Sequence, residues 1–180
     1  VLKRLCLICC LYLVAALSVP VTAQDLSRDQ LLAVYLFRLA EHIQWANQAA
    51  IERYQIHVID RGDELAHLLR TIADDRQLHG KPFSVSRSTS VQLPEVVHLV
   101  YLADSGDDAF ARALTQVADR NVLLVTNNVE DQRNIMINLI DTVEQQISFE
   151  INKANIINQN LGMAPDVVLL GGTEIDVAQL

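Results

Sequence analysis

Residues 96–102 read Val-Val-His-Leu-Val-Tyr-Leu, a nearly continuous apolar run. A run of this length is typical of a central strand in a parallel sheet, where helices cover both faces. Residues 122–125, Val-Leu-Leu-Val, have the same character. These two stretches predict the centre of a buried parallel sheet.

The neighbouring segments alternate between strand and helix patterns. Residues 55–60 and 82–89 predict strands, and apolar residues at helical spacing predict a helix that begins at Asp63 and ends before Gly80. A third helix is expected from Ser105, with Asp107 and Asp108 in its first turn. Strand–helix alternation of this kind predicts βαβ units with parallel strands.

Further elements are expected at both ends of this series. Ser27 and Gln30 form a capping-box pattern, which predicts a helix that runs to near Asn47. Residues 135–140 and 147–151 predict a hairpin. A helix is expected over 153–161, ended by Gly162, and a short helix from Pro165 to the glycine pair 171–172. The predicted fold is a single three-layer α/β domain: a mixed, mostly parallel sheet flanked by helices, with a C-terminal hairpin and terminal helices.

The first 23 residues have the pattern of a secretory signal peptide. Lys3 and Arg4 precede an apolar run from Leu5 to Leu17, which is shorter than a membrane-spanning helix, and Val21 and Ala23 are small residues at a cleavage site. An uncleaved membrane anchor is the alternative. We expect a periplasmic domain over residues 24–180.

Composition limits the classes of function. The chain has 22 acidic and 14 basic residues, a net charge of -8, so nucleic acid is not an expected partner. Cleavage of the predicted signal peptide removes all three cysteines, Cys6, Cys9 and Cys10. The remaining domain therefore has no thiol for a disulfide, a thiolate metal site or a cysteine nucleophile.

The loops after the predicted strands are acidic and contain neither a GxGxxG nor a Walker sequence, so no nucleotide cofactor is expected. Asp60, Asp104 and Asn127 define a candidate crevice for a small molecule, and Asp60, Asp104 and Asp108 are an alternative set of ligands for a divalent cation. The acidic residues near 63 and 105–108 are alternatively helix caps. The five histidines have no zinc spacing and there is no GxSxG elbow, so neither a zinc site nor a catalytic residue is predicted.

Apolar residues are abundant in the first predicted helix. Its apolar residues at helical spacing already form one face wide enough to pack on the core. This apolar surface is enlarged further by Tyr35, Phe37 and Trp45. The excess has two interpretations, burial in the core or a surface for a protein partner. Tyr35 and Trp45 are the candidate partner-binding residues.

These residues resemble the YfiR family. The segment from Leu36 to Trp45 is similar to the aromatic-rich first helix of that family, and Phe149-Glu150-Ile151-Asn152 is similar to its Phe-Glu-Ile-Asn signature. The signature residues are thus Trp45, Phe149, Glu150 and Asn152, with Phe149 expected to point inward. The sequence departs from the family in having Ala46 where Pro follows the tryptophan, and in lacking the family's disulfide cysteines.

The resemblance implies a non-catalytic periplasmic domain that controls a membrane-bound diguanylate cyclase or histidine kinase by protein–protein contact, with a homodimer as a further possibility. No cofactor is implied. A periplasmic small-molecule or cation-binding module is the alternative. Residues 171–180 extend past the apolar terminal segment, which leaves open whether Leu180 is the natural end or the chain leads into a receptor.

Overall fold

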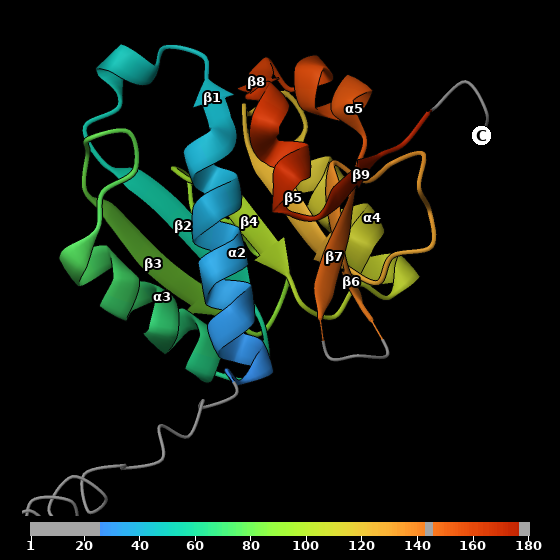
Figure 1. Cartoon of the computed structure of the whole chain (residues 1–180), viewed down its shortest axis with the longest axis horizontal. Helices are drawn as coiled ribbons and strands as arrows, with labels where there is room; N and C mark the ends of the chain where they lie inside the picture. Colours follow the sequence, from blue (N-terminus) through green and yellow to red (C-terminus); the bar gives the residue numbers. More distant parts are fainter. Residues whose placement is uncertain (1–25, 143–145, 177–180) are drawn as a thin grey trace, which may run out of the picture.

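The computed structural model describes residues 26–142 and 146–176 and contains a seven-stranded sheet in the order β3-β2-β4-β5-β6-β7-β9 (Figure 1). Neighbouring strands from β3 to β6 are parallel, whereas β7 is antiparallel to β6 and parallel to β9. The predicted mixed, mostly parallel sheet is therefore confirmed. The strands are β2 (Tyr54–Ile59), β3 (Phe83–Ser88), β4 (Leu99–Leu102), β5 (Leu123–Asn127), β6 (Ile137–Asp141), β7 (Ile147–Ile151) and β9 (Gly172–Glu174).

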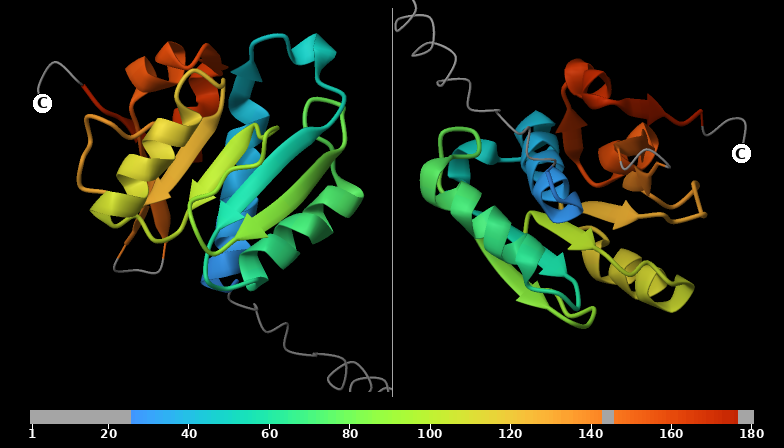
Figure 2. Two further views of the ribbon diagram at one scale, coloured as in Figure 1. Left: turned by 180° about the vertical axis from the view of Figure 1, so that it is seen from behind. Right: turned by 60° about the horizontal axis from the view of Figure 1, so that its bottom comes forward.

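Helices cover both faces of this sheet. Figure 1 shows α2 and α3 in front of it, and Figure 2 shows α4 on the opposite face. This arrangement confirms the predicted three layers. The helical segments are α2 (Arg28–His42), η1 (Gln48–Ala50), α3 (Glu64–Asp75), α4 (Asp107–Val117), α5 (Lys153–Asn158) and η2 (Pro165–Leu170).

The core lies where the apolar runs predicted it. All four residues of β4 are buried, as are Leu123 and Leu124 of β5, because helices pack on both faces of these strands. Helix α2 begins with the predicted capping box, in which Ser27 Oγ accepts a hydrogen bond from the Gln30 N–H and Gln30 Oε1 accepts one from the Ser27 N–H.

The end of the first helix was predicted wrongly. Helix α2 ends at His42, and β1 (Ile43–Trp45) pairs antiparallel with β8 (Leu161–Met163) in a separate two-stranded sheet. Ile43 and Trp45 are buried while Gln44 is exposed, which is the period of a strand. The same pairing places Gly162 inside β8, so α5 ends earlier than predicted and Gly162 does not cap it.

The C-terminal segment contains a strand that the sequence pattern did not predict. Gly171 has a φ of 106° and ends η2, as expected for a glycine cap. Gly172, however, begins β9, which adds to the edge of the sheet beside β7. The hairpin of β6 and β7 is confirmed by its antiparallel register.

Some predictions concern residues that the structure does not describe. The signal peptide with its cysteines falls within residues 1–25, and the end at Leu180 falls within 177–180. In the described ranges, no helix is both long enough and apolar enough to cross a membrane.

Candidate functional site

Polar side chains gather at the carboxyl edge of the parallel strands. From β2 the chain forms β3 on one side and then returns to place β4 on the other side of β2. Neighbouring loops therefore diverge between β2 and β4, and ligands of open α/β sheets usually bind at such a point, outside the carboxyl ends of the strands. Asp60 follows β2, Asp104 lies just beyond β4, and Asn127 ends β5.

The three predicted crevice residues border two cavities rather than one. Asp60 and Asp104 line a cavity of about 490 Å³, and Asp104 and Asn127 line another of about 770 Å³. Asp104 belongs to both, and its carboxylate forms an ion pair with Arg61 at 3.2 Å. The structure thus brings these residues together in pairs.

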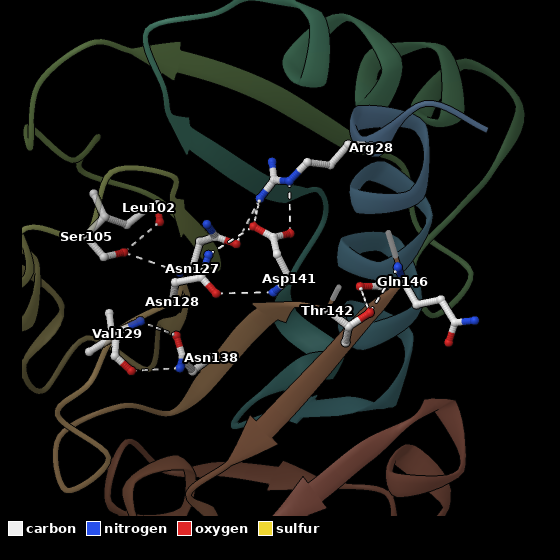
Figure 3. Close-up of polar contacts among 10 residues, drawn as sticks. All are labelled: Arg28, Leu102, Ser105, Asn127, Asn128, Val129, Asn138, Asp141, Thr142 and Gln146. Atoms are coloured by element: carbon white, nitrogen blue, oxygen red, sulfur yellow. Dashed lines mark hydrogen bonds and ion pairs between the residues drawn. The ribbon is translucent and has the colours of Figure 1, made fainter. Parts of the chain in front are cut away.

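A polar cluster closes the same edge beside the start of α2 (Figure 3). Arg28 donates from Nε and Nη2 to the two carboxylate oxygens of Asp141, at 3.0 and 2.9 Å, and from Nη2 to Asn127 Oδ1 at 3.0 Å. Asn128 Nδ2 donates to Asp141 Oδ2 at 3.0 Å. The cluster therefore joins the first turn of α2 to the ends of β5 and β6.

The charges in this cluster stabilise each other. Hydrogen bonding to Asp141 raises the pKa of Arg28, and hydrogen bonding from Arg28 lowers the pKa of Asp141. Both side chains are almost half exposed, at 47% and 40%, so we expect this ion pair to contribute only about 0.5–1 kcal/mol. Sequence analysis did not predict the pair, because its partners are 113 residues apart.

Asn138 shapes the loop that follows β5 from a fully buried position. Its Oδ1 accepts hydrogen bonds from Thr126 Oγ1 and the Val129 N–H, and its Nδ2 donates to the Val129 carbonyl and to Glu150 Oε2. Ser105 fixes the neighbouring loop, because its hydroxyl donates to the Leu102 carbonyl and accepts from the Asn127 N–H (Figure 3). These contacts hold the polar loops in defined positions.

The Phe-Glu-Ile-Asn segment has an internal structural role. Phe149 points inward as predicted and is 1% exposed, whereas Glu150 lies on the opposite face and accepts hydrogen bonds from Gln132 and Asn138. Asn152 is fully buried at the end of β7, where its Oδ1 caps α5 and its Nδ2 donates to the Gln132 and Arg133 carbonyls.

Tyr35 and Trp45, the candidate partner residues, differ in exposure. Tyr35 is half-buried, with its ring edge-on to Phe149 at a centroid distance of 6.1 Å. Trp45 is only 5% exposed, packs on Tyr54 at 5.1 Å, and donates from Nε1 to the His98 carbonyl. Burial in the core therefore accounts for most of the apolar surface of Trp45.

Comparison with known families agrees with these features. A family model described as YfiR/HmsC-like matches residues 29–171, well over half of the chain. The chain belongs to the YfiR/HmsC-like family. The resemblance to this family that the sequence indicated is thereby confirmed. A search of curated proteins found no match.

The surroundings of two histidines in this YfiR/HmsC-like domain disfavour the protonated form of their rings. His57 lies between Ser86 Oγ at Nδ1 and Ser88 Oγ at Nε2. Because Ser88 donates its hydroxyl proton to the Ser90 carbonyl, His57 Nε2 must be the donor to Ser88. His98 Nδ1 accepts a hydrogen bond from the Gln55 N–H, which protonation would remove. Burial lowers the pKa of both rings.

These histidines predict a loss of stability in mild acid. Because the folded-state pKa is below the ordinary value of 6.5, the unfolded chain binds protons more readily. Their contribution is complete above that value and declines as the pH falls below it. We expect the urea midpoint, followed by fluorescence of Trp45, to decrease between about pH 7 and about pH 5.

Two substitutions test the assignment of this effect. His98→Gln should make the decrease shallower, because glutamine does not titrate and retains an acceptor for the Gln55 N–H. His67→Gln, at an exposed position on α3, is the matched control for the replacement of a histidine by glutamine. An unchanged midpoint across the range would contradict the predicted role of His57 and His98.

The described part of this YfiR/HmsC-like domain contains no group of three or more His, Cys, Asp or Glu side chains arranged to hold a metal ion. His57 contacts Ser86, as the base contacts the nucleophile in a Ser–His–Asp triad. The other ring nitrogen of His57, however, contacts the Ser88 hydroxyl rather than a carboxylate. The arrangement thus supplies polar cavities and rigid loops, and its strongest charge pair, Arg28 with Asp141, joins elements of the fold.

Proposed function

We propose that this YfiR/HmsC-like domain is a non-catalytic regulatory or sensory domain of the periplasm, which controls a membrane-bound diguanylate cyclase or histidine kinase by protein–protein contact. The family match over residues 29–171 carries the proposal. The signal-peptide pattern of residues 1–23 supports export to the compartment where such a partner presents its extracytoplasmic part.

The contact surface that we infer lies on α2 and η2, which are side by side in Figure 1. His42 Nε2 at the end of α2 lies 3.7 Å from Asp166 Oδ2 of η2, and the Ala164 N–H donates a hydrogen bond to the His42 carbonyl. The hydroxyl of the partly exposed Tyr35 lies beside Gly171 at the end of η2, and η2 carries Leu169, an apolar side chain that is 82% exposed. A large exposed apolar side chain next to a partly exposed aromatic ring favours a protein contact.

Tyr35 and Trp45 have different parts in this proposal. The partly exposed edge of Tyr35 adds to the α2–η2 surface, while its buried edge contacts Phe149. Trp45 is not part of the exposed surface. Its buried ring packs on Tyr54 and so holds β1 in place directly after α2. Binding to the partner would regulate it by favouring one of two pre-existing states, as any ligand with differential affinity does.

Leu169→Asp is the variant that tests the contact surface. The charge is placed on an 82% exposed side chain, so the domain should keep its unfolding midpoint. We expect its affinity for the periplasmic part of the partner cyclase or kinase to fall at least about tenfold, as measured by interferometry. Tyr35→Asp is a poorer test, because it also removes the Phe149 contact.

Val96→Asp is the matched control. Val96 is also an exposed apolar residue, at 59%, but it lies in the loop before β4, which is hydrogen-bonded to Gln116 of α4 on the face of the sheet opposite to α2. It should bind as the unmodified domain does. Equal affinity of Leu169→Asp and the unmodified domain would show that α2 and η2 are not the contact, and failure to bind any such cyclase or kinase would contradict the proposed function.

A further inference from the structure

The cavity between the carboxyl ends of β2 and β4 has the dimensions of a small-molecule site. Its volume of about 490 Å³ falls within the range of ligand pockets in proteins. Ile59, Leu102 and Ala109 supply apolar lining, and α4 forms one wall. It also lies where the strand order reverses, the position at which open α/β sheets usually bind ligands.

The loops around this cavity are fixed by side chains that contact their backbone. Gln116 of α4 accepts a hydrogen bond from the Leu93 N–H and donates to the Val91 carbonyl, and Arg120 donates to the Pro94 carbonyl. On the opposite wall, Arg87 donates to the Asp60 carbonyl at 2.8 Å. These hydrogen bonds fix the loop between β3 and β4 against α4, the helix that Figure 2 shows on the face of the sheet opposite to α2.

Some polar side chains at the rim of the cavity have hydrogen-bond or ion-pair partners, and others have none among the described residues. Arg61 and Asp104 neutralise each other as an ion pair. Arg112 of α4, in contrast, lines the cavity without an ion pair or hydrogen bond to any described residue. The Asp60 carboxylate accepts one hydrogen bond at Oδ1, from the Gly62 N–H, and none from the described residues at Oδ2. One cation and one acceptor therefore remain available.

We propose that this cavity binds a small carboxylate that also carries a hydrogen-bond donor. Arg112 takes the ligand carboxylate, because a guanidinium presents paired donors to two carboxylate oxygens. Asp60 Oδ2 accepts from a hydroxyl or an ammonium group of the same ligand, and Gln92 and Ser90 lie within reach of further polar atoms at the rim. A divalent cation is disfavoured here, because Arg112 and Arg61 share the cavity with the two carboxylates.

The test measures binding of four probes to the uniformly ¹⁵N-labelled domain by NMR titration. Gluconate supplies a carboxylate with hydroxyl donors only, and L-serine supplies a carboxylate with an ammonium donor in addition to a hydroxyl. Glycine betaine has a carboxylate without a donor, and glucose has donors without a carboxylate. We expect gluconate or serine to cause saturable shifts at Asp60, Gln92 and Arg112, with betaine and glucose at least about tenfold weaker.

Arg112→Gln should weaken binding of the active probe at least about tenfold, whereas Arg53→Gln, which removes an exposed arginine elsewhere, should have no effect. Saturable binding by gluconate alone assigns the donor as a hydroxyl, and by serine alone as an ammonium. Absence of saturable binding by both at millimolar concentration, or binding that Arg112→Gln leaves intact, would overturn the proposal. Neither result bears on the α2–η2 contact, which is tested separately.

Discussion

Asn152→Ala should lower the free energy of unfolding by about 3 kcal/mol, a large effect for a polar residue. The Asn152 side chain has no exposed surface and makes hydrogen bonds in two directions. Its Oδ1 accepts from the Asn155 N–H at the start of α5, and its Nδ2 donates to the Gln132 and Arg133 carbonyls at 3.1 Å. Alanine loses the cap and leaves the Gln132 carbonyl without this donor. Urea unfolding followed by circular dichroism measures the loss.

Two further variants separate the parts of this effect. Asn152→Ser retains a capping oxygen but is too short to reach both carbonyls, so it should recover only about 1 kcal/mol. Asn158→Ala removes an exposed asparagine from the same helix and should change stability by less than about 0.5 kcal/mol. Full recovery with serine would show that the contacts to residues 132 and 133 contribute nothing.

The role of Asn152 explains what the Phe-Glu-Ile-Asn segment does in this domain. Along β7, Phe149 and Ile151 enter the core while Glu150 binds Gln132 and Asn138 on the other face. Asn152 then ends the strand and begins α5. Each residue of the segment thus positions a neighbouring element, and none of the four side chains is exposed. The segment therefore stabilises the fold, and a partner surface has to be sought on other residues.

Local patterns predicted those elements whose burial is decided by their own sequence. The continuous apolar run of β4 predicts a strand covered on both faces, and the alternation from Ile147 to Ile151 predicts a strand with one core face. The capping box at Ser27 likewise depends on residues three positions apart. In each case the interactions that decide the structure are near in sequence.

Elements decided by distant pairing were missed. Leu36, Leu39 and Ile43 fit helical spacing, so nothing local ends the helix at His42, and the strand β1 depends on pairing with β8 more than 100 residues later. The three residues of β9 are too few to show a period. The three predicted crevice residues do lie at one edge of the sheet, but the ion pair of Arg61 and Asp104 and the position of Arg112 became evident only from the folded chain.

Replacement of Gly172 should cause the second large loss of stability, because a side chain at this position would clash with Phe149. Gly172 lies opposite Phe149 in the β7–β9 register, and the Phe149 ring covers its Cα. A Cβ atom at position 172 would lie 2.7 Å from Phe149 Cζ and 2.8 Å from Cδ2, and closer still to Cε2. These distances are well inside van der Waals contact. Since φ of Gly172 is not in the left-handed region, the restriction comes from the ring rather than from backbone conformation.

Gly172→Ala should therefore destabilise the domain by about 2–3 kcal/mol, because the Phe149 ring must move and its other edge is held by Tyr35. Calorimetric or urea unfolding measures the change. Gly62→Ala is the control: the nearest atom to its Cβ would be Asp60 Oδ2 at 3.8 Å, so stability should be unchanged or slightly increased.

A double-mutant cycle with Phe149→Leu identifies the clash itself. Leucine is smaller than phenylalanine and leaves room above position 172, so alanine there should be less destabilising by at least about 1 kcal/mol than in the unmodified domain. Hydrogen exchange at Ile175, whose N–H donates to the Ile151 carbonyl, should show whether β9 separates from β7 before the rest of the sheet unfolds. Additive effects of the two substitutions would mean that the Phe149 ring is not what excludes a side chain at position 172. Because η2 leads directly into β9, early separation of β9 would also predict that Gly172→Ala weakens partner binding through η2, although position 172 lies outside the proposed contact.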